Sequence, residues 1–318
     1  YLSSDCYLCR CYLPFSPIES VMSLTVRENK RMVTIAELIS LAADSSLAEV
    51  MIDLEMKVSG RTKEEIWGEM ARNLVAMEQA VEKGLTGVAS MTGFSGGDAP
   101  ELTDYLEKMS PFSGKNTLQA ARNAIATNEL NASMGVICAT PTAGSAGVCA
   151  GVITMMKEVH GVNENQQVNF LFTAGAVGLA IANQASISGA QGGCQAEVGS
   201  ASAMASAGLV ELAGGTPEQC GHAVALTLMN TMGLVCDPVA GLVEIPCITR
   251  NAMGASLALL TADMALAGIK SAIPADEVIQ AMDQVGRKMP TMFKETAEGG
   301  LADTPTGRKI TAQLFGKQ

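Results

Sequence analysis

Three cysteines of this chain stand in settings that suit metal ligands. Cys194 follows a Gly-Gly pair, Cys236 precedes Asp-Pro, and Cys247 follows Ile-Pro. Thiolates on glycyl and prolyl turns are what a protein-bound iron–sulfur cluster needs. Three thiolates instead of four would leave one iron open for Lewis-acid chemistry. The three cysteines are too far apart in the sequence for a zinc ribbon, whose ligands come in close pairs. Their spacing alone does not establish an iron–sulfur cluster.

Polar side chains lie within a few positions of these cysteines. A cluster needs hydrogen bonds to its sulfurs and neighbouring charge to tune it, although ordinary polar groups of a loop would look the same in sequence. The residues concerned are Gln195, Glu197, Asp237, Glu244, Arg250 and Asn251.

The other six cysteines have different surroundings. Three lie among alanines and glycines in a helix-like context and are predicted to be buried as small apolar residues: Cys138, Cys149 and Cys220. The remaining three, Cys6, Cys9 and Cys11, lie near the N-terminus. Cys6-x-x-Cys9 is at most an incomplete metal half-site, because no second pair or nearby histidine completes it.

Two hydroxyl-rich loops are candidates for substrate binding. Residues 139–145 contain Thr140, Thr142 and Ser145 around Pro141 and Gly144. Their hydroxyls and backbone N–H groups could bind a carboxylate at the start of a helix, although plain helix capping would use the same residue types. Ser186 and Ser188, before another glycine-rich stretch, are interpreted in the same way.

The two histidines indicate no catalytic site. His160 precedes Gly161 and is predicted to cap the C-terminal end of a helix, whereas His222 is predicted to be a hydrogen-bonded core residue. The sequence contains no Ser/His/Asp order, Walker loop or dinucleotide fingerprint, and no evident context for a pyridoxal lysine.

The elements that must position these residues are helices. Apolar residues recur with a 3.6-residue period in residues 34–43, and capping boxes precede further helices at Thr62 and Thr216. A similar motif at residues 98–101 is predicted to open a helix near residues 102–108. Alternating strand patterns are nearly absent. With 48% apolar but only 4% aromatic residues, the composition favours closely packed helices. We therefore predict an all-α fold, with one helical domain over residues 32–318 and an atypical, mobile or non-native N-terminal extension over residues 1–31.

The net charge and the number of cysteines limit the partners and the cellular compartment that we expect. A formal net charge of −11 argues against binding to nucleic acid or to an anionic membrane surface. Nine cysteines without a signal peptide indicate a reducing compartment, and we expect a cytoplasmic protein. The most apolar runs are too short or too interrupted to span a membrane.

Several long sequence segments, taken together, resemble the alpha chain of the two-chain, iron–sulfur-dependent bacterial L-serine dehydratases. The resemblance extends from Met32 to the C-terminus. It is carried by residues 137–147, 185–199, 233–247, 250–255 and 299–307.

This resemblance implies a [4Fe–4S] cluster held by three cysteines, which match Cys194, Cys236 and Cys247. It implies an all-helical catalytic domain that converts L-serine to pyruvate and ammonia without pyridoxal phosphate; a monovalent cation is a further candidate cofactor. In single-chain relatives a C-terminal cysteine occupies the open iron. This chain ends in residues 314–318 without a cysteine, so water or substrate is the expected fourth ligand. A separate beta chain with a Ser-Ser-His-Thr-like motif is the expected partner in a hetero-oligomer.

The resemblance also implies roles for the polar residues. The serine hydroxyl is expected to bind the open iron while a base, unassigned here and plausibly a beta-chain histidine, removes the α-proton. The residues expected to hold the substrate carboxylate or amino group, or to orient the substrate, are Thr140, Thr142, Ser145, Ser186, Ser188, Arg250 and Asn251. The alternatives are a related cluster lyase that prefers L-threonine or L-cysteine, a non-catalytic iron–sulfur sensor, and a metal-free helical scaffold.

Overall fold

The computed structural model of the chain describes residues 33–316. Helices dominate this range, in which β pairing is limited to two isolated bridges, Ala89–Gly96 and Cys236–Lys294. The predicted all-α fold class is confirmed. The predicted extension, residues 1–31 with Cys6, Cys9 and Cys11, lies outside the described residues. The helices are α2 (Ile35–Leu41), α3 (Leu47–Ser59), α4 (Lys63–Gly84), α5 (Asp98–Lys108), α6 (Lys115–Ala132), α7 (Ala146–His160), α8 (Glu164–Gln184), α9 (Gly189–Gly192), α10 (Cys194–Leu212), α11 (Pro217–Thr231), α12 (Cys247–Leu266), α13 (Ala275–Lys288) and α14 (Pro305–Phe315), with short 3₁₀ turns η1 (Val239–Gly241), η2 (Thr291–Phe293) and η3 (Gly300–Asp303).

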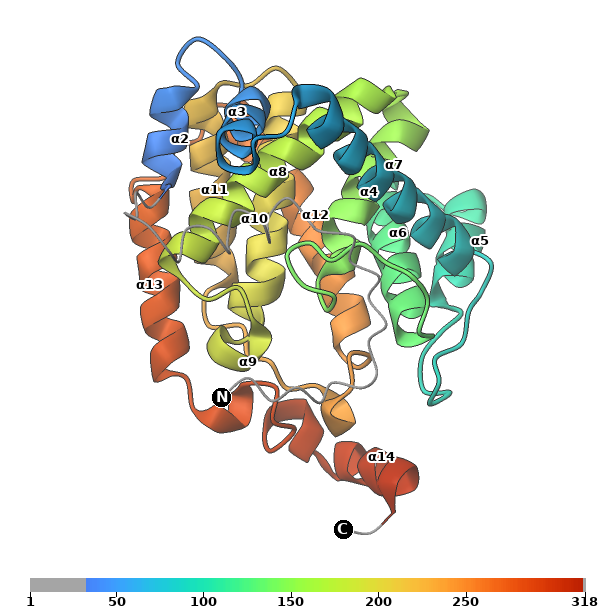
Figure 1. The fold of residues 1–318 in the computed structure, drawn as a ribbon. Helices are drawn as coiled ribbons and strands as arrows, with labels where there is room; N and C mark the ends of the chain where they lie inside the picture. The colour runs from blue at the N-terminus through green and yellow to red at the C-terminus, as the bar shows by residue number, and fades with distance from the viewer. Residues whose placement is uncertain (1–32, 317–318) are drawn as a thin grey trace.

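Helix α10 forms the centre of the bundle, and α8, α11 and α12 pack around it (Figure 1). Of its 19 residues 16 are buried, so it has no polar face turned to water. A helix buried on every side needs small or apolar residues all round, which is what its run of Ala, Ser and Gly provides. At Gly208 a Cβ atom would lie 2.6 Å from the Phe170 ring of α8. The composition therefore reflects close helix–helix approach.

The local start signals of two helices are confirmed. Thr62 and Glu65 form the capping box that begins α4, and Thr216 and Gln219 form the one that begins α11, with Pro217 in the first turn. These contacts involve residues three positions apart, so they form as soon as the first turn does.

Three carboxylates cap helices from distant parts of the chain. Asp276 of α13 accepts the first two backbone N–H groups of α2, at 2.8 and 3.0 Å. Glu211 of α10 does the same for α3, at 2.7 and 3.2 Å. Glu129 of α6 accepts the N–H groups of Asp98 and Ala99 at the start of α5. A capping motif at residues 98–101 was expected to open α5, but no side chain of that helix caps it; the cap comes from α6 instead.

The remote cap of α2 leads to a stability prediction. Asp276→Ala is expected to lower the free energy of unfolding by about 1–2 kcal/mol, because two helix N–H groups lose a charged acceptor. The measurement is chemical denaturation followed by circular dichroism. Glu277→Ala is the matched control: Glu277 is the exposed neighbour in the same first turn, and we expect a change within about 0.5 kcal/mol. Equal effects of the two variants would contradict a capping role for Asp276.

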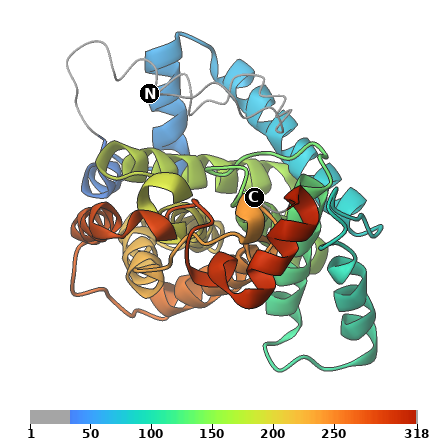
Figure 2. The same cartoon turned by 90° about the horizontal axis from the view of Figure 1, so that it is seen from below.

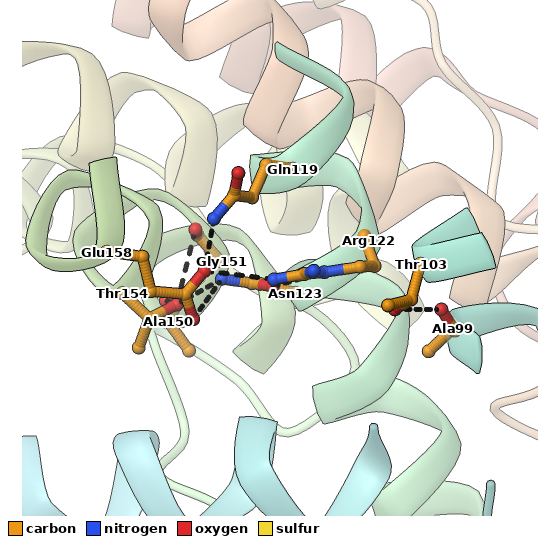
Figure 3. A network of polar contacts seen from close by, with 9 residues as sticks. All are labelled: Ala99, Thr103, Gln119, Arg122, Asn123, Ala150, Gly151, Thr154 and Glu158. Atoms are coloured by element: carbon orange, nitrogen blue, oxygen red, sulfur yellow. Dashed lines mark hydrogen bonds and ion pairs between the residues drawn. The ribbon is translucent and has the colours of Figure 1, made fainter. Parts of the chain in front are cut away.

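Polar contacts also join α6 to α7 (Figure 3). Asn123 donates to the Thr154 hydroxyl at 2.9 Å, and Arg122 pairs with Glu158 at 2.9 Å. Gln119 donates to the same Glu158 carboxylate. These contacts fix the register of the helix pair, and with it the position of the loop that precedes α7.

The helix starts that carry the predicted site lie at one end of the bundle. The N-terminal ends of α10 and α12 and the short helix α9 are at the lower end in Figure 1, and Figure 2 shows α14 lying across this end. Helix α14 packs against η1 and η3 there. Among the helices of residues 33–316, none combines the length and the hydropathy that a membrane span requires.

Candidate metal centre

Two of the three predicted ligand cysteines begin helices. Cys194 is the first residue of α10 and Cys247 the first residue of α12, and their N-caps are Gly193 and Pro246. Neither N-cap supplies a side-chain hydrogen bond to the first turn, and the positive end of each helix dipole lies at the cysteine. Such an end stabilises the thiolate, which is the form that binds metal. Cys236 lies in the loop between α11 and η1.

The three thiols converge in the interior of the protein. Cys194, Cys236 and Cys247 are 1, 2 and 7% exposed. One ligand atom each from Cys194, Cys236 and Glu197 all lie within 4.8 Å of one another. Glu197 follows Cys194 by three positions on α10, which places both on one helix face. The charge of Cys194 reaches Cys247 as well, since it raises the pKa of that thiol.

This donor set fits an iron–sulfur cluster. Thiolates select soft metals and clusters. The ligand atoms of a single tetrahedral zinc ion lie about 3.8 Å apart, given a zinc–sulfur bond of about 2.3 Å. Cys247 does not complete the tight group formed by Cys194, Glu197 and Cys236. Cysteines that bind separate irons of one cluster can be spread more widely, so the three cysteines are compatible with a cluster.

The thiols differ in how readily they lose a proton. A hydrogen bond from Cys236 lowers the pKa of Cys194 against the opposing effect of burial, and the Arg250 guanidinium lowers it further. The same hydrogen bond, together with burial, raises the pKa of Cys236, while burial raises that of Cys247. In the metal-free protein Cys194 is therefore the most acidic thiol of the three.

Arg250, on the first turn of α12, joins a ligand sulfur to a buried carboxylate. Its Nη1 lies 3.5 Å from the Cys194 sulfur and donates to the Val235 carbonyl at 2.8 Å. Its Nη2 forms a 2.8 Å ion pair with Asp237, and the two side chains are 14% and 5% exposed. Burial opposes the charge of Arg250, but the negative groups Cys194 and Asp237 raise its pKa overall. The predicted contact with substrate stays a prediction.

The loop before α7 packs against Glu197. Thr142 donates to Glu197 Oε1. Ser145 is the N-cap residue of α7, yet its hydroxyl does not cap the helix. It bonds to the Thr142 hydroxyl at 3.0 Å and to the Thr140 carbonyl at 3.1 Å. The predicted substrate loop thus lies beside the group formed by Cys194, Glu197 and Cys236, and the Thr142 hydroxyl bonds both to the Ser145 hydroxyl and to Glu197.

Asn251 connects α12 to the same loop. It is completely buried and donates to the carbonyls of Gly144, at 2.7 Å, and Cys247, at 2.9 Å. It accepts the Gly147 N–H at 3.1 Å. These contacts hold the start of α7 against the start of α12. Substrate contact by Asn251 stays a prediction.

Ser186 and Ser188 lie in the loop between α8 and α9. Ser186 Oγ accepts the Ser188 N–H at 3.1 Å, and Ser188 is the N-cap residue of α9. Ser186 lines a cavity of about 520 Å³ between α8, α9, α10 and α13, together with Gln191 and Asp283. The volume is ample for an amino acid, so Ser186 remains a candidate for substrate binding.

A contact with Cys236 that the sequence did not suggest comes from the segment after α13. Cys236 N–H donates to the Phe293 carbonyl, and Glu295 N–H donates to the Cys236 carbonyl, both at 2.8 Å. Leu301 N–H donates to Asp237 Oδ2 at 2.8 Å. Backbone pairing of this kind has no side-chain signature, which is why sequence patterns missed it.

The remaining described cysteines are not part of the group formed by Cys194, Glu197 and Cys236. Cys149 on α7 and Cys220 on α11 are 0% and 1% exposed, as predicted, and burial raises the pKa of Cys149 to about 12. Cys138 is half-buried in the loop before α7 instead of lying in a helix.

The predictions for the two histidines have different outcomes. His160 ends α7 before the left-handed Gly161, as predicted. His222 is half-buried, so the prediction of a core histidine is wrong. It lies on a face of α11 one turn after Glu218, whose negative charge interacts with it.

Close packing around the thiols predicts a sensitive glycine. At Gly189 a Cβ atom would lie 2.9 Å from both the Cys236 sulfur and Glu197 Oε2. Gly189→Ala is expected to weaken Co²⁺ binding by the metal-free protein about 10- to 100-fold, as other outer-shell changes do; the thiolate-to-cobalt absorption measures it. Gly175→Ala in α8 is the control, because a Cβ there meets nothing within 4 Å, and we expect unchanged Co²⁺ affinity with up to about 1 kcal/mol of added stability.

Comparison with known proteins identifies the family. The family model "Serine dehydratase alpha chain" matches residues 42–302, which include the three predicted ligand cysteines. The "Probable L-serine dehydratase, alpha chain" of Bacillus subtilis is 57% identical over 284 residues, covering 89% of this chain and 95% of that one. The "L-serine dehydratase, alpha chain" of Peptoniphilus asaccharolyticus is 42% identical over 264 residues, covering 82% and 90%. "L-serine dehydratase 2" of Escherichia coli is 35% identical over 266 residues, which are 81% of this chain but 58% of that one. This chain belongs to the serine dehydratase alpha chain family.

Proposed function

We propose that this chain is the alpha chain of an L-serine ammonia-lyase, which converts L-serine to pyruvate and ammonia and works with a separate beta chain. The names of its relatives support both the substrate and the partner. The observation that carries the proposal is the convergence of Cys194, Cys236 and Cys247, buried at the ends of α10 and α12 and in the loop between α11 and η1.

We propose that these three cysteines hold a [4Fe–4S] cluster. When bound, the cluster supplies a Lewis acid that eases departure of the substrate hydroxyl, which is otherwise a poor leaving group. The chain's own contribution is to balance charge. The helix N-termini at Cys194 and Cys247 and the Arg250 guanidinium at the Cys194 sulfur offset the negative charge of the thiolates.

The polar loops on either side are proposed to bind the substrate. Thr140 and Thr142 precede α7 and Ser186 and Ser188 precede α9, and both loops reach the surroundings of Glu197, through Thr142 and through Gly189. Ser145 and Asn251 bond within the first loop and are proposed to keep it in place around the substrate. Arg250 is proposed to orient the substrate carboxylate from the cysteine side.

We propose that the general base, which the sequence leaves unassigned, lies on the beta chain, with a histidine as the candidate. This chain has two histidines. His160 lies at the far end of α7 from the Thr140–Ser145 loop, and a 15-residue helix is about 22 Å long. His222 lies near the start of α11, whereas Cys236 follows the end of that helix. Neither histidine is placed to take a proton from a substrate beside the cysteines.

The test is anaerobic purification of the alpha chain with its beta chain. Iron, sulfide and pyruvate formation are measured with L-serine, L-threonine and L-cysteine in parallel. We expect a cluster, fastest turnover of L-serine, and loss of activity when iron is removed. Faster turnover of another amino acid would favour the related lyases. A cluster without lyase activity would favour a sensor, and a protein that binds no metal would leave only a helical scaffold. Full activity after cluster removal, without pyridoxal phosphate, would refute the mechanism.

A further inference from the structure

Glu197 projects into the cysteine group from the first turn of α10. One of its carboxylate oxygens lies within 4.8 Å of the sulfurs of both Cys194 and Cys236. This is an unfavourable place for a carboxylate, because it sits beside groups that must become thiolates. A cation at this point would remove the conflict.

The protein itself supplies no such cation to Glu197. Among the ion pairs of residues 33–316, none involves Glu197. The guanidinium at the site, Arg250, lies on the Cys194 sulfur and pairs with Asp237. The two carboxylate oxygens also differ. Oε1 accepts a hydrogen bond from Thr142, whereas no hydrogen-bond donor of the described chain contacts Oε2.

Two glycines shape a cradle around this carboxylate. At Gly144 a Cβ atom would lie 2.6 Å from Oε1, and at Gly189 it would lie 2.9 Å from Oε2 and from the Cys236 sulfur. The loop before α7 therefore lies against Oε1 of Glu197, and the start of α9 lies against Oε2. Thr142 holds Oε1, as outer-shell donors hold ligating carboxylates, and Oε2 is left on the side of the Cys236 sulfur.

We infer that Glu197 is the fourth protein ligand of the metal centre and binds, through Oε2, the iron that the three cysteines leave open when no substrate is present. The inference rests on the proposed function and deepens it, since it replaces water as the expected resting ligand. An oxygen donor is a weaker partner for a soft site than a thiolate, so a substrate oxygen can replace it. The carboxylate, held by Thr142, stays beside the vacated position.

The experiment uses the alpha–beta holoenzyme, reconstituted with ⁵⁷Fe without oxygen and free of L-serine. Two readouts follow the open iron: Mössbauer spectra, and broadening of the electron paramagnetic resonance signal of the reduced cluster in H₂¹⁷O. In the unaltered protein we expect one iron distinct from the others and no ¹⁷O broadening. Glu197→Gln is expected to admit water and to show the broadening. Glu197→Cys is expected to make all the irons alike and to slow the loss of cluster in air.

Glu295→Gln is the matched control. Glu295 also interacts with the charges of Cys236 and Cys247, but it is not part of the tight ligand group, so both readouts should stay unchanged. Absence of a cluster from the unaltered protein would refute the proposed function. A cluster whose ¹⁷O broadening is the same with and without Glu197 would overturn only this inference. If Glu197→Gln does not retain its cluster, Glu197→Cys decides: a persistently distinct iron in that variant also overturns it.

Discussion

Cys236→Ala protein, purified anaerobically with its beta chain, is expected to contain almost no iron and to form no pyruvate. A [4Fe–4S] cluster brings about four irons per chain, so the iron content should fall from about four to near zero. The physical reason is that Cys236 is buried, hydrogen-bonded to Cys194 and clamped on both sides by backbone bonds to the segment after α13. Cys194→Ala and Cys247→Ala should behave alike.

Cys149→Ala is the control for this result. Cys149 is equally buried, but it lies inside α7, and its thiol approaches the Ala201 carbonyl, at 3.8 Å, and the Thr140 side chain. Losing it should cost about 1 kcal/mol of stability and leave the iron content unchanged. Iron, sulfide and pyruvate assays distinguish the two variants. An iron-free Cys149→Ala protein would mean that general destabilisation, and not loss of a ligand, empties the site.

Arg250→Gln is expected to destabilise the metal-free protein by about 3–5 kcal/mol, because it leaves the buried Asp237 carboxylate without its partner. The Cys194 thiolate loses its neighbouring cation in the same step. Chemical denaturation measures the first effect, and iron content after reconstitution measures the second. Arg250→Lys should be intermediate, since one ammonium cannot reach the Cys194 sulfur, the Val235 carbonyl and Asp237 together.

The pH dependence of the same variant is a sharper readout. The folded protein lowers the pKa of Cys194, so the thiolate contributes stability above the ordinary thiol pKa of about 8.5, and this contribution is lost as the pH falls through the lowered value. Between these two values the unfolded chain binds the extra proton, and unfolding free energy rises with pH. In Arg250→Gln this rise should shrink. Folding raises the pKa values of Cys236 and Cys247, and these two thiols lower the unfolding free energy with rising pH only above the ordinary thiol pKa. The pH range below that value therefore reports on Cys194.

Two further variants test whether the loss of the buried ion pair, and not altered packing, destabilises Arg250→Gln. Arg308→Gln removes an exposed pair with Asp303, whose side chains are 62% and 54% exposed, and should change stability by less than about 1 kcal/mol. Arg250→Gln combined with Asp237→Asn removes both buried charges and should recover part of the lost stability. A double variant no more stable than Arg250→Gln alone would show that the ion pair is not the cause.

Much of the fold follows from signals that act within one helical turn. The capping boxes at Thr62 and Thr216 and the left-handed Gly161 after His160 each depend on residues three or four positions apart. Such contacts form wherever the helix forms, so they can be predicted before any tertiary structure is known. The start of α5 could not be predicted in this way, because its cap is Glu129 from another helix.

The features of the metal centre also divide into those that the sequence predicts and those that depend on the tertiary structure. The sequence by itself determined an all-helical protein and singled out Cys194, Cys236 and Cys247, because glycine and proline neighbours distinguish them locally from cysteines inside helices. Only the tertiary structure placed two of them at helix starts, set Arg250 against the Cys194 sulfur, and brought the segment after α13 onto Cys236. The physical reason is that these contacts join residues 40 or more positions apart along the chain, and their proximity depends on how small side chains let α10 and its neighbours pack.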